Sequence, residues 1–337
     1  AAQRTLTIAA AADAGGIDVI AASDDPDSWD AFALLGAVAT VARRARLGPS
    51  VANPVHRHPN LIAASIATLD RLSGGRAVLG LGRGQPEWYE RALGIDSSRP
   101  LARLAETIEL LRQWGAPPHR AASRSGDVFA VRDWARTIHP VQAHVPVYLA
   151  AAGPQALALA ARAADGVIFN NLTSPAFIAE TIPLVRDAAR GAGRDPAALA
   201  FILRTAVQVT DDPAAAIRAA KDGLAVINTL PGMARLLTTP GFDIPAIVAA
   251  ARQAMRTEEA LAAGLGFADL RAAGDIAAAR AAIPDDLVAQ LVIAGDLAHV
   301  RARLAHLAAL GVTQVSVKPP PEPTSAAWRE LLDALRG

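Results

Sequence analysis

The chain has 337 residues, 33 Lys plus Arg against 32 Asp plus Glu, and no cysteine, so its formal net charge is +1. This near-neutral balance, without a block of basic residues, gives no footprint for nucleic acid or for an anionic membrane. The lack of cysteine excludes disulfides, zinc–thiolate sites and thiol nucleophiles. Because 52% of the residues are hydrophobic and only 4% aromatic, helices packed on a buried sheet fit better than a β-sandwich.

No uncharged apolar stretch is long enough to cross a membrane, because the longest, Val145 to Ala161, is broken by Gly153 and Pro154. No basic segment followed by an apolar core opens the chain, so no signal peptide is visible. We therefore expect a cytoplasmic protein that does not contact a membrane.

Short β-type runs alternate with amphipathic helical segments over most of the chain. The predicted strands are Asp18 to Ala22, Ala45 to Val51, Ala77 to Gly82, Val145 to Ala150, Gly166 to Asn170, Phe201 to Val209 and Val312 to Val317. Alternation of this kind predicts a single α/β domain, a (β/α)8 barrel that spans residues 1–337.

The chain begins in a predicted helix that ends at Gly15 and Gly16, and only seven strands are visible where a closed barrel has eight. We therefore predict that a first strand lies upstream of Ala1. Asp27, with Asp30 in the first turn, fits a helix N-cap; Pro59 and Pro154 fit first helical positions, and Gly74 fits a helix end.

Two segments interrupt the repeat, and both follow strands. Residues 83 to 145 contain a helix and a hairpin-like stretch from Gly126 to Thr137, and residues 230 to 295 are Ala-rich and helical. Counting the absent strand, they are insertions after the fourth and seventh strands. Loops after barrel strands form the active face, so we expect these insertions to wall or cover the site.

Four loops after strands carry candidate chemistry. The run from Gly80 to Gln85 fails both the dinucleotide and P-loop patterns, but a glycine-rich strand end with Arg83 beside it suits a flat ligand or a phosphate as well as it suits simple helix packing. The turn Ala152-Gly153-Pro154 opens a helix, whose free N–H groups suit a phosphate; an ordinary βα turn is the alternative.

The third loop holds His56 and His58 at a spacing that makes a poor metal site, and we predict no metal. It is either a polar loop of the active face or a capping loop. Asp24 and Asp25 follow the first visible strand, where a carboxylate could hold a polar ring edge or move protons. No Ser-His-Asp set or G-x-S-x-G pattern is present, which disfavours a hydrolase.

Together these segments resemble the luciferase-like superfamily of barrels, and within it the branch dependent on the deazaflavin coenzyme F420 that includes methylenetetrahydromethanopterin reductase. The resemblance rests on Leu47 to Pro59 continuing through Ala67 to Gly82, on Val145 to Asn170, and on Ala294 to Lys318. It implies F420-dependent hydride transfer to or from a small organic substrate, with a methylene-tetrahydropterin as the nearest suggestion, and a homodimer.

The resemblance also implies positions for the site. It places a non-prolyl cis peptide between Ser50 and Val51 behind the deazaflavin ring and cofactor phosphate at the turn Ala152, Gly153 and Pro154. The ring would be lined by Asp24, Asn53, Arg83 and Gly84.

The proton-transfer positions depart from the family pattern. Relatives often have Asp-His where this chain has Asp24-Asp25, and an acid where this chain has Gln85. The candidate catalytic positions are therefore Asp24, Asp25, His56, Gln85 and Glu87. Two alternatives remain open: an FMN-dependent monooxygenase of the same superfamily, and a non-catalytic cofactor-binding protein.

Overall fold

The computed structural model describes residues 2–86 and 88–336. Seven parallel strands form its centre: β1 (Val19–Ala22), β2 (Arg46–Pro49), β3 (Leu79–Leu81), β6 (Val147–Ala150), β7 (Gly166–Phe169), β8 (Ala200–Val209) and β10 (Gln314–Val317). Each lies where the sequence predicts a strand, with ends that differ by at most two residues. Short apolar runs between polar, glycine-rich or proline-rich turns are the signal that located them.

The strands follow the order β10-β8-β7-β6-β3, and β2 and β1 form a separate parallel pair. Two isolated parallel bridges, Leu47 with Ala77 and Ala52 with Leu81, join that pair to β3. The two-residue strand β9 (Ala294–Gly295) pairs in parallel with the last two residues of β8. Among the described strands none pairs β1 with β10, so the curved sheet is a barrel wall with one open seam.

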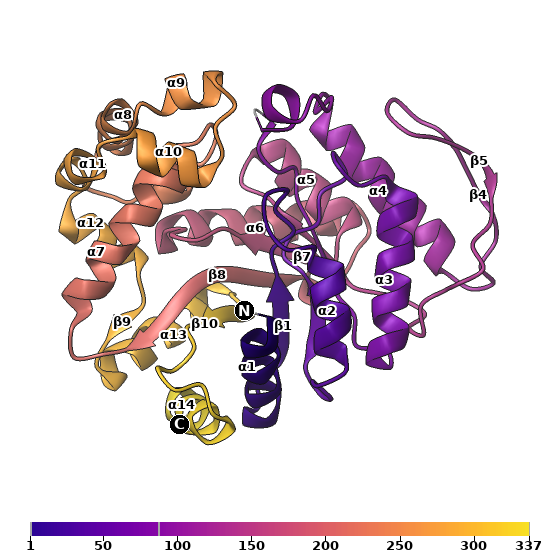
Figure 1. Cartoon of the computed structure of the whole chain (residues 1–337), viewed down its shortest axis with the longest axis horizontal. Coiled ribbons are helices and arrows are strands. Elements are labelled where there is room, and N and C mark those ends of the chain that lie inside the picture. Colours follow the sequence, from indigo (N-terminus) through magenta and orange to yellow (C-terminus); the bar gives the residue numbers. More distant parts are fainter. Residues whose placement is uncertain (1, 87, 337) are drawn as a thin grey trace.

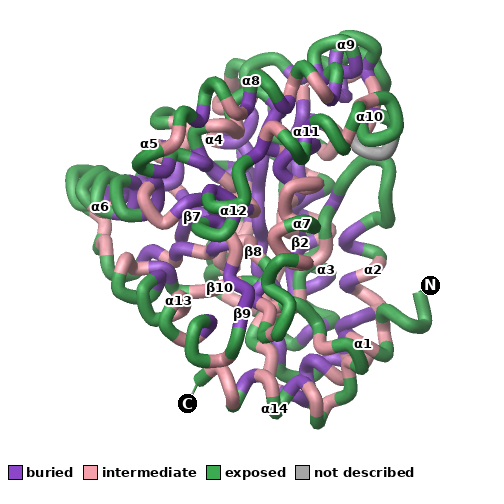
Figure 2. Tube along the Cα trace, turned by 90° about the vertical axis from the view of Figure 1, so that its left-hand side faces the viewer, coloured by how far each residue is buried: buried purple, intermediate pink, exposed green. Residues whose placement is uncertain are grey.

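Helices surround this wall (Figure 1). They are α1 (Ala2–Gly15), α2 (Ala31–Ala39), α3 (Pro59–Ser73), α4 (Pro100–Gly115), α5 (Pro154–Ala163), α6 (Pro175–Gly191), α13 (Leu297–Leu310) and α14 (Ser325–Arg336), with the short 3-10 turn η2 (Pro196–Ala198) before β8. In Figure 2 the outer turns of helices such as α6 and α9 are exposed, while buried stretches run through the interior. In the described part of the chain no helix combines the length and the apolar character that membrane crossing requires.

The helix caps follow the sequence signals in most places. Pro59 and Pro154 occupy the first turns of α3 and α5, and Gly74 ends α3 in the left-handed conformation with φ of 70°. Asp27 is not an N-cap, which corrects the sequence prediction. The cap of α2 is Asp30, whose side chain accepts a hydrogen bond from the N–H of Ala33, because the helix begins one turn later than expected.

The predicted hairpin is present but begins earlier. Its strands β4 (Ala122–Ser125) and β5 (Ala130–Trp134) are antiparallel, so the first strand precedes Gly126. The buried carboxylate of Glu106 on α4 accepts hydrogen bonds from the N–H groups of Asp127 and Phe129 and fixes the turn. A carboxylate reaching back from a preceding helix leaves no local sequence signal, which explains the shifted boundary.

The segment between β8 and β9 is helical, as predicted, and we call residues 213–291 the cap. Its elements are α7 (Pro213–Gly223), η3 (Leu224–Asn228, a π-helix), η4 (Ala234–Leu237), α8 (Ile244–Met255), α9 (Thr257–Ala262), α10 (Phe267–Ala273), α11 (Ile276–Ala282) and α12 (Asp285–Leu291). Most buried apolar residues of the cap form a second hydrophobic cluster with Leu172, while Leu236 of η4 belongs to the main cluster under the barrel helices. In Figure 1 it lies at one side of the barrel, above β8.

Candidate functional site

A cavity of about 640 Å³ lies where the carboxyl ends of the strands meet the cap. Parallel sheets bind ligands at this edge. The cavity brings together predicted positions from four separate loops: Asp25, Val51, Arg83, Gly84, Gln85, Ala152, Gly153 and Pro154. Asp24, Ser50, Asn53 and His56 do not line it, and Glu87 lies outside the described residues.

The peptide bond between Ser50 and Val51 is cis, as predicted. The N–H of Ser50 donates to the carbonyl of Ala22, and the N–H of Ala52 donates to the carbonyl of Gly80. A Cβ at Gly82 would lie 2.5 Å from Cγ2 of Val51, so the glycine is what lets Val51 occupy this position. The result is an apolar wall of the cavity beside a glycine-rich strand end.

Asp24 is held in an ion pair beside the cavity. It is 5% exposed, and the guanidinium of Arg57 donates to both carboxylate oxygens, at 2.7 and 2.9 Å. Burial opposes ionisation of Asp24, but the contacts with His56 and Arg57 outweigh burial and lower its pKa to about 2. Asp24 is therefore ionised at neutral pH and acts as an anchor for the His56–Arg57 loop.

Asn53 and His56 form a second buried group with Tyr89. The amide of Asn53 donates to the Tyr89 hydroxyl at 2.8 Å and accepts from the N–H of Val55. The His56 ring stacks on Tyr89 at 5.6 Å. Burial, with the negative charges of Asp25 and Asp24, raises the pKa of Tyr89, so its phenol stays neutral. These residues support the glycine loop at Gly84 from behind.

The turn predicted to bind phosphate has a feature that the sequence did not reveal. Gly153 caps α5 without a side-chain hydrogen bond, so the helix presents free N–H groups. A Cβ at Gly153 would meet only Nη1 of Arg235, at 3.9 Å. Arg235 lies on η4 of the cap, 5.7 Å over the Phe177 ring. A helix N-terminus and a guanidinium thus face the same small space, which suits an anion.

Asp25 and Gln85 are the predicted proton-transfer positions that the structure places in the cavity. Partial burial and the negative charge of Asp27 raise the pKa of Asp25, while Arg204 acts in the opposite direction. A carboxyl group with a raised pKa is better suited to exchange a proton near neutral pH than Asp24 is. Gln85 is buried and contributes an amide but no titratable group.

The cap is joined to the loop after β3. That loop continues into the π-helix η1 (Trp88–Ala92). The indole N–H of Trp88 donates to the carbonyl of Leu265 at 2.7 Å, and Arg83 donates to the carbonyl of Pro231 at 3.1 Å. Arg91 donates to the carbonyl of Ala262. The cap, which covers the cavity, is therefore hydrogen-bonded to the loop after β3, which forms the opposite side of the cavity.

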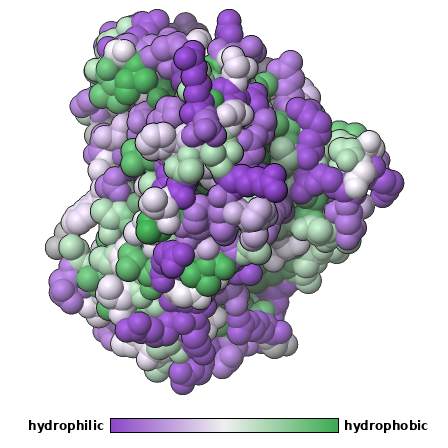
Figure 3. Space-filling model, turned by 90° about the vertical axis from the view of Figure 1, so that its right-hand side faces the viewer, coloured by the Kyte–Doolittle hydropathy of each residue, from purple (hydrophilic) through white to green (hydrophobic). Residues whose placement is uncertain are grey.

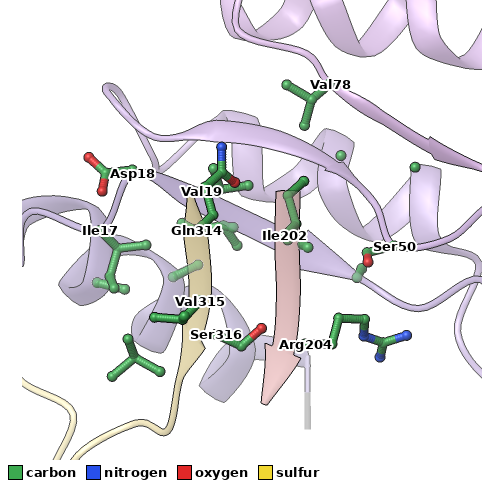
Figure 4. Close-up of a pocket in the computed structure, with 18 of the residues that line it drawn as sticks. Ile17, Asp18, Val19, Ser50, Val78, Ile202, Arg204, Gln314, Val315 and Ser316 are labelled. Carbon is green, nitrogen blue, oxygen red and sulfur yellow. The ribbon is translucent and has the colours of Figure 1, made fainter. Parts of the chain in front are cut away.

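A larger cavity, of about 890 Å³, occupies the seam between β1 and β10 (Figure 4). Its lining includes Val19 and Ile20 from β1 and Val315 from β10, with α1 and α14 behind them. Arg204, near the middle of β8, lines both this cavity and the smaller one. The seam holds none of the predicted cofactor contacts except Ser50, so the smaller cavity is the candidate active site.

Comparison with known proteins identifies the family of the chain. The model of the luciferase-like monooxygenase family matches residues 1–314. The chain belongs to the luciferase-like monooxygenase family. A Mycobacterium tuberculosis protein whose name describes a coenzyme F420-dependent oxidoreductase is 32% identical over 331 residues, covering 94% of this chain and 90% of that protein.

Two further members are methylenetetrahydromethanopterin reductases. The Archaeoglobus fulgidus protein is 36% identical over 159 residues, but this match covers only 47% of the present chain and 46% of the reductase. The solved structure of the F420-dependent tetrahydromethanopterin reductase from Methanopyrus kandleri has a TM-score of 0.78 and 25% identity, covering 98% of this chain and 93% of that one. This member of the luciferase-like family therefore shares the α/β barrel architecture of those reductases.

Proposed function

We propose that this chain is an F420-dependent oxidoreductase that transfers a hydride between the deazaflavin and a small organic substrate. The observation that carries the proposal is the pairing of an anion-binding corner, at Gly153 and Arg235, with an apolar wall at Val51 in one cavity. The names of the similar proteins support F420 over FMN as the cofactor. A methylene-tetrahydropterin is the substrate that those names favour.

The residues present fit the cofactor. Val51, Gly82 and Ile168 offer a flat apolar surface for a tricyclic ring, and the free N–H groups of α5 with Arg235 suit its phosphate. When bound, F420 supplies the hydride donor or acceptor carbon. Leu101, Leu104 and Met233 line the cavity and exclude water.

The protein's part in the reaction is to position the reactants and to handle charge. We assign the proton to a carboxylate oxygen of Asp25, because this group lines the cavity and has a raised pKa. Asp24 and Arg57 hold the adjacent loop, and Gln85 offers its amide to a polar group of the ligand.

The deciding experiment is a titration of the purified protein with F420 and, separately, with FMN, following the fluorescence of each cofactor. Micromolar or tighter binding of F420 with weak binding of FMN would support the proposal. Preference for FMN would favour the monooxygenase alternative. Binding of F420 without turnover of any hydride acceptor would favour a non-catalytic binding protein.

Replacement of Arg235 tests the phosphate corner. We expect Arg235→Met to weaken F420 binding about ten- to a hundredfold, because a charge-assisted contact is lost while packing on Phe177 is partly kept. Fluorescence titration measures the change. Arg190→Met, at an exposed ion pair on α6, is the control and should bind F420 like the wild type. Equal affinities for the two variants would remove Arg235 from the site.

We further propose that residues 1–337 form one domain and that an extended strand closes the barrel in the seam between β1 and β10. Two parallel edges face each other there, and α1 lies where a helix following that strand would pack. The two excursions, the hairpin and the cap, are then insertions after the fourth and seventh barrel strands. A structure of the chain with its upstream residues would test this.

A homodimer is the assembly we propose. Large apolar side chains are exposed around α3 and the hairpin, namely Leu61, Trp134, Ile138 and Val141. The indole of Trp134 donates to Asn60, which places that ring beside α3. Figure 3, which faces the hairpin side, shows hydrophobic areas between hydrophilic ones. Sedimentation equilibrium would show a dimer that Trp134→Glu dissociates, and a monomeric wild type would contradict it.

A further inference from the structure

Arg204 is a cation inside the barrel that the cofactor proposal does not use. It stands on β8 between Leu203 and Thr205, and it is half-buried. Burial lowers the pKa of its guanidinium, and the negative charge of Asp25 partly compensates. In Figure 4 its side chain extends from β8 toward the side on which Ser50 lies.

The charge of Arg204 is not neutralised by an ion pair. Within residues 2–86 and 88–336 its guanidinium has no hydrogen-bond or ion-pair partner, and Asp25 influences it only through space. A charge that is partly removed from water and has no partner is costly, so such groups ordinarily contact an opposite charge. Among the described lining residues of the candidate active site, Asp25 is the only acid.

The other two arginines that line the cavity differ from Arg204, because one has a hydrogen-bond partner and the other lies at the anion-binding corner. Arg83 donates to the carbonyl of Pro231, and Arg235 lies at the Gly153 turn over the Phe177 ring. Among the described residues that line it, three arginines against one aspartate leave the cavity cationic. With the cofactor phosphate assigned to Arg235, the charge on β8 is available to a second anion.

We propose that Arg204 is a specificity-determining residue that selects a substrate carrying a carboxylate, by binding that carboxylate through its guanidinium. This inference rests on the proposed function, because it assigns the Gly153 corner to the cofactor. A planar guanidinium binds a carboxylate through two parallel hydrogen bonds, and in a partly desolvated cavity such a contact discriminates strongly against a neutral isostere.

The test uses a matched pair of probes, phenylacetate and its isosteric amide, phenylacetamide. Both are titrated by calorimetry into the full chain, with and without F420, for the wild type, Arg204→Met, Arg204→Lys and the exposed control Arg218→Met. F420 affinity is measured in parallel for each variant. The amide differs from the acid in charge but not in shape, so the ratio of the two affinities isolates the charged contact.

We expect the wild type and Arg218→Met to bind the acid about tenfold or more tightly than the amide. Arg204→Met should bring that ratio close to one, Arg204→Lys should leave part of it, and F420 affinity should stay unchanged. Equal binding of the two probes by the wild type would overturn the inference, whether or not Arg204→Met folds. So would selectivity that persists in Arg204→Met, or a loss of F420 binding in that variant.

Failure of the proposed function gives a different result. If the wild type does not bind F420, the cofactor assignment is wrong. The ratio measured without F420 still decides whether Arg204 selects an acid.

Discussion

Gly84→Ala is expected to destabilise the protein by about 2–5 kcal/mol, the sum of a left-handed backbone penalty and of overpacking. Gly84 has φ of 64°, and a Cβ there would lie 2.0 Å from Nδ2 of Asn53 and 2.4 Å from the Tyr89 hydroxyl. Those two side chains are each 2% exposed and bonded to each other, so neither can move aside without breaking a buried hydrogen bond. Urea unfolding measures the loss.

Gly94→Ala is the matched control for that substitution. Gly94 has nearly the same backbone angle, with φ of 65°, but a Cβ there meets nothing within 4 Å. Gly94→Ala should therefore lower the free energy of unfolding only by the backbone penalty of about 1–2 kcal/mol. If the two alanine variants unfold at the same urea concentration, the Asn53–Tyr89 support of the cavity loop is not rigid.

The second large effect is expected for Arg57→Met, which leaves the buried Asp24 without its partner. Removing one member of a buried ion pair costs about 3–5 kcal/mol, because the remaining charge is shielded from water and here keeps only the His56 ring, at 3.6 Å. The loss should appear as a lower midpoint of urea unfolding at pH 7. Asp30→Asn is the control, since Asp30 bonds the same guanidinium but is half exposed.

Asparagine still caps α2, so Asp30→Asn should cost less than about 1 kcal/mol. The pH dependence of stability gives an independent measurement. Asp24 has a folded pKa of about 2 against an ordinary value of 3.8, so its stabilisation is complete above pH 4 and is lost as pH falls toward 2. In Arg57→Met the guanidinium no longer opposes the effect of burial, so the pKa of Asp24 rises. Acidification through this range should therefore reduce the difference in stability between the variant and the wild type. A stability difference that does not change with pH would contradict the ion pair between Asp24 and Arg57.

The strand pattern and the loops of the active face could be predicted from the sequence. Apolar runs and the Gly or Pro residues at their ends are signals contained in short segments. Gly84 and Gly153 were placed near a ligand by their positions after strands and Val51 by the family resemblance, and all three line one cavity. The cis bond at Ser50 was implied by the family resemblance and is present. The predictions that the structure confirms are therefore those that depend on short segments or on a shared motif.

The partners of those residues could not be predicted in the same way. Arg57 meets Asp24 across 33 positions, and Arg235 reaches Gly153 from the cap, so no spacing rule links them. Tyr89 is separated from Asn53 by 36 positions. Arg204 did leave a signal, since a lone charge interrupts the apolar run from Phe201 to Val209. In an otherwise uncharged strand of a parallel sheet, such a charge indicates a functional position.

The separate hydrophobic cluster of the cap has a consequence for how new specificities arise. Because Leu224, Met255 and Leu287 belong to this cluster and not to the barrel cluster, substitutions among them can reshape the cap without disturbing the apolar wall at Val51. Evolution can therefore exchange or reshape the cap as a module. Laboratory libraries confined to the cluster residues of the cap should yield folded variants more often than libraries of equal size in the strands.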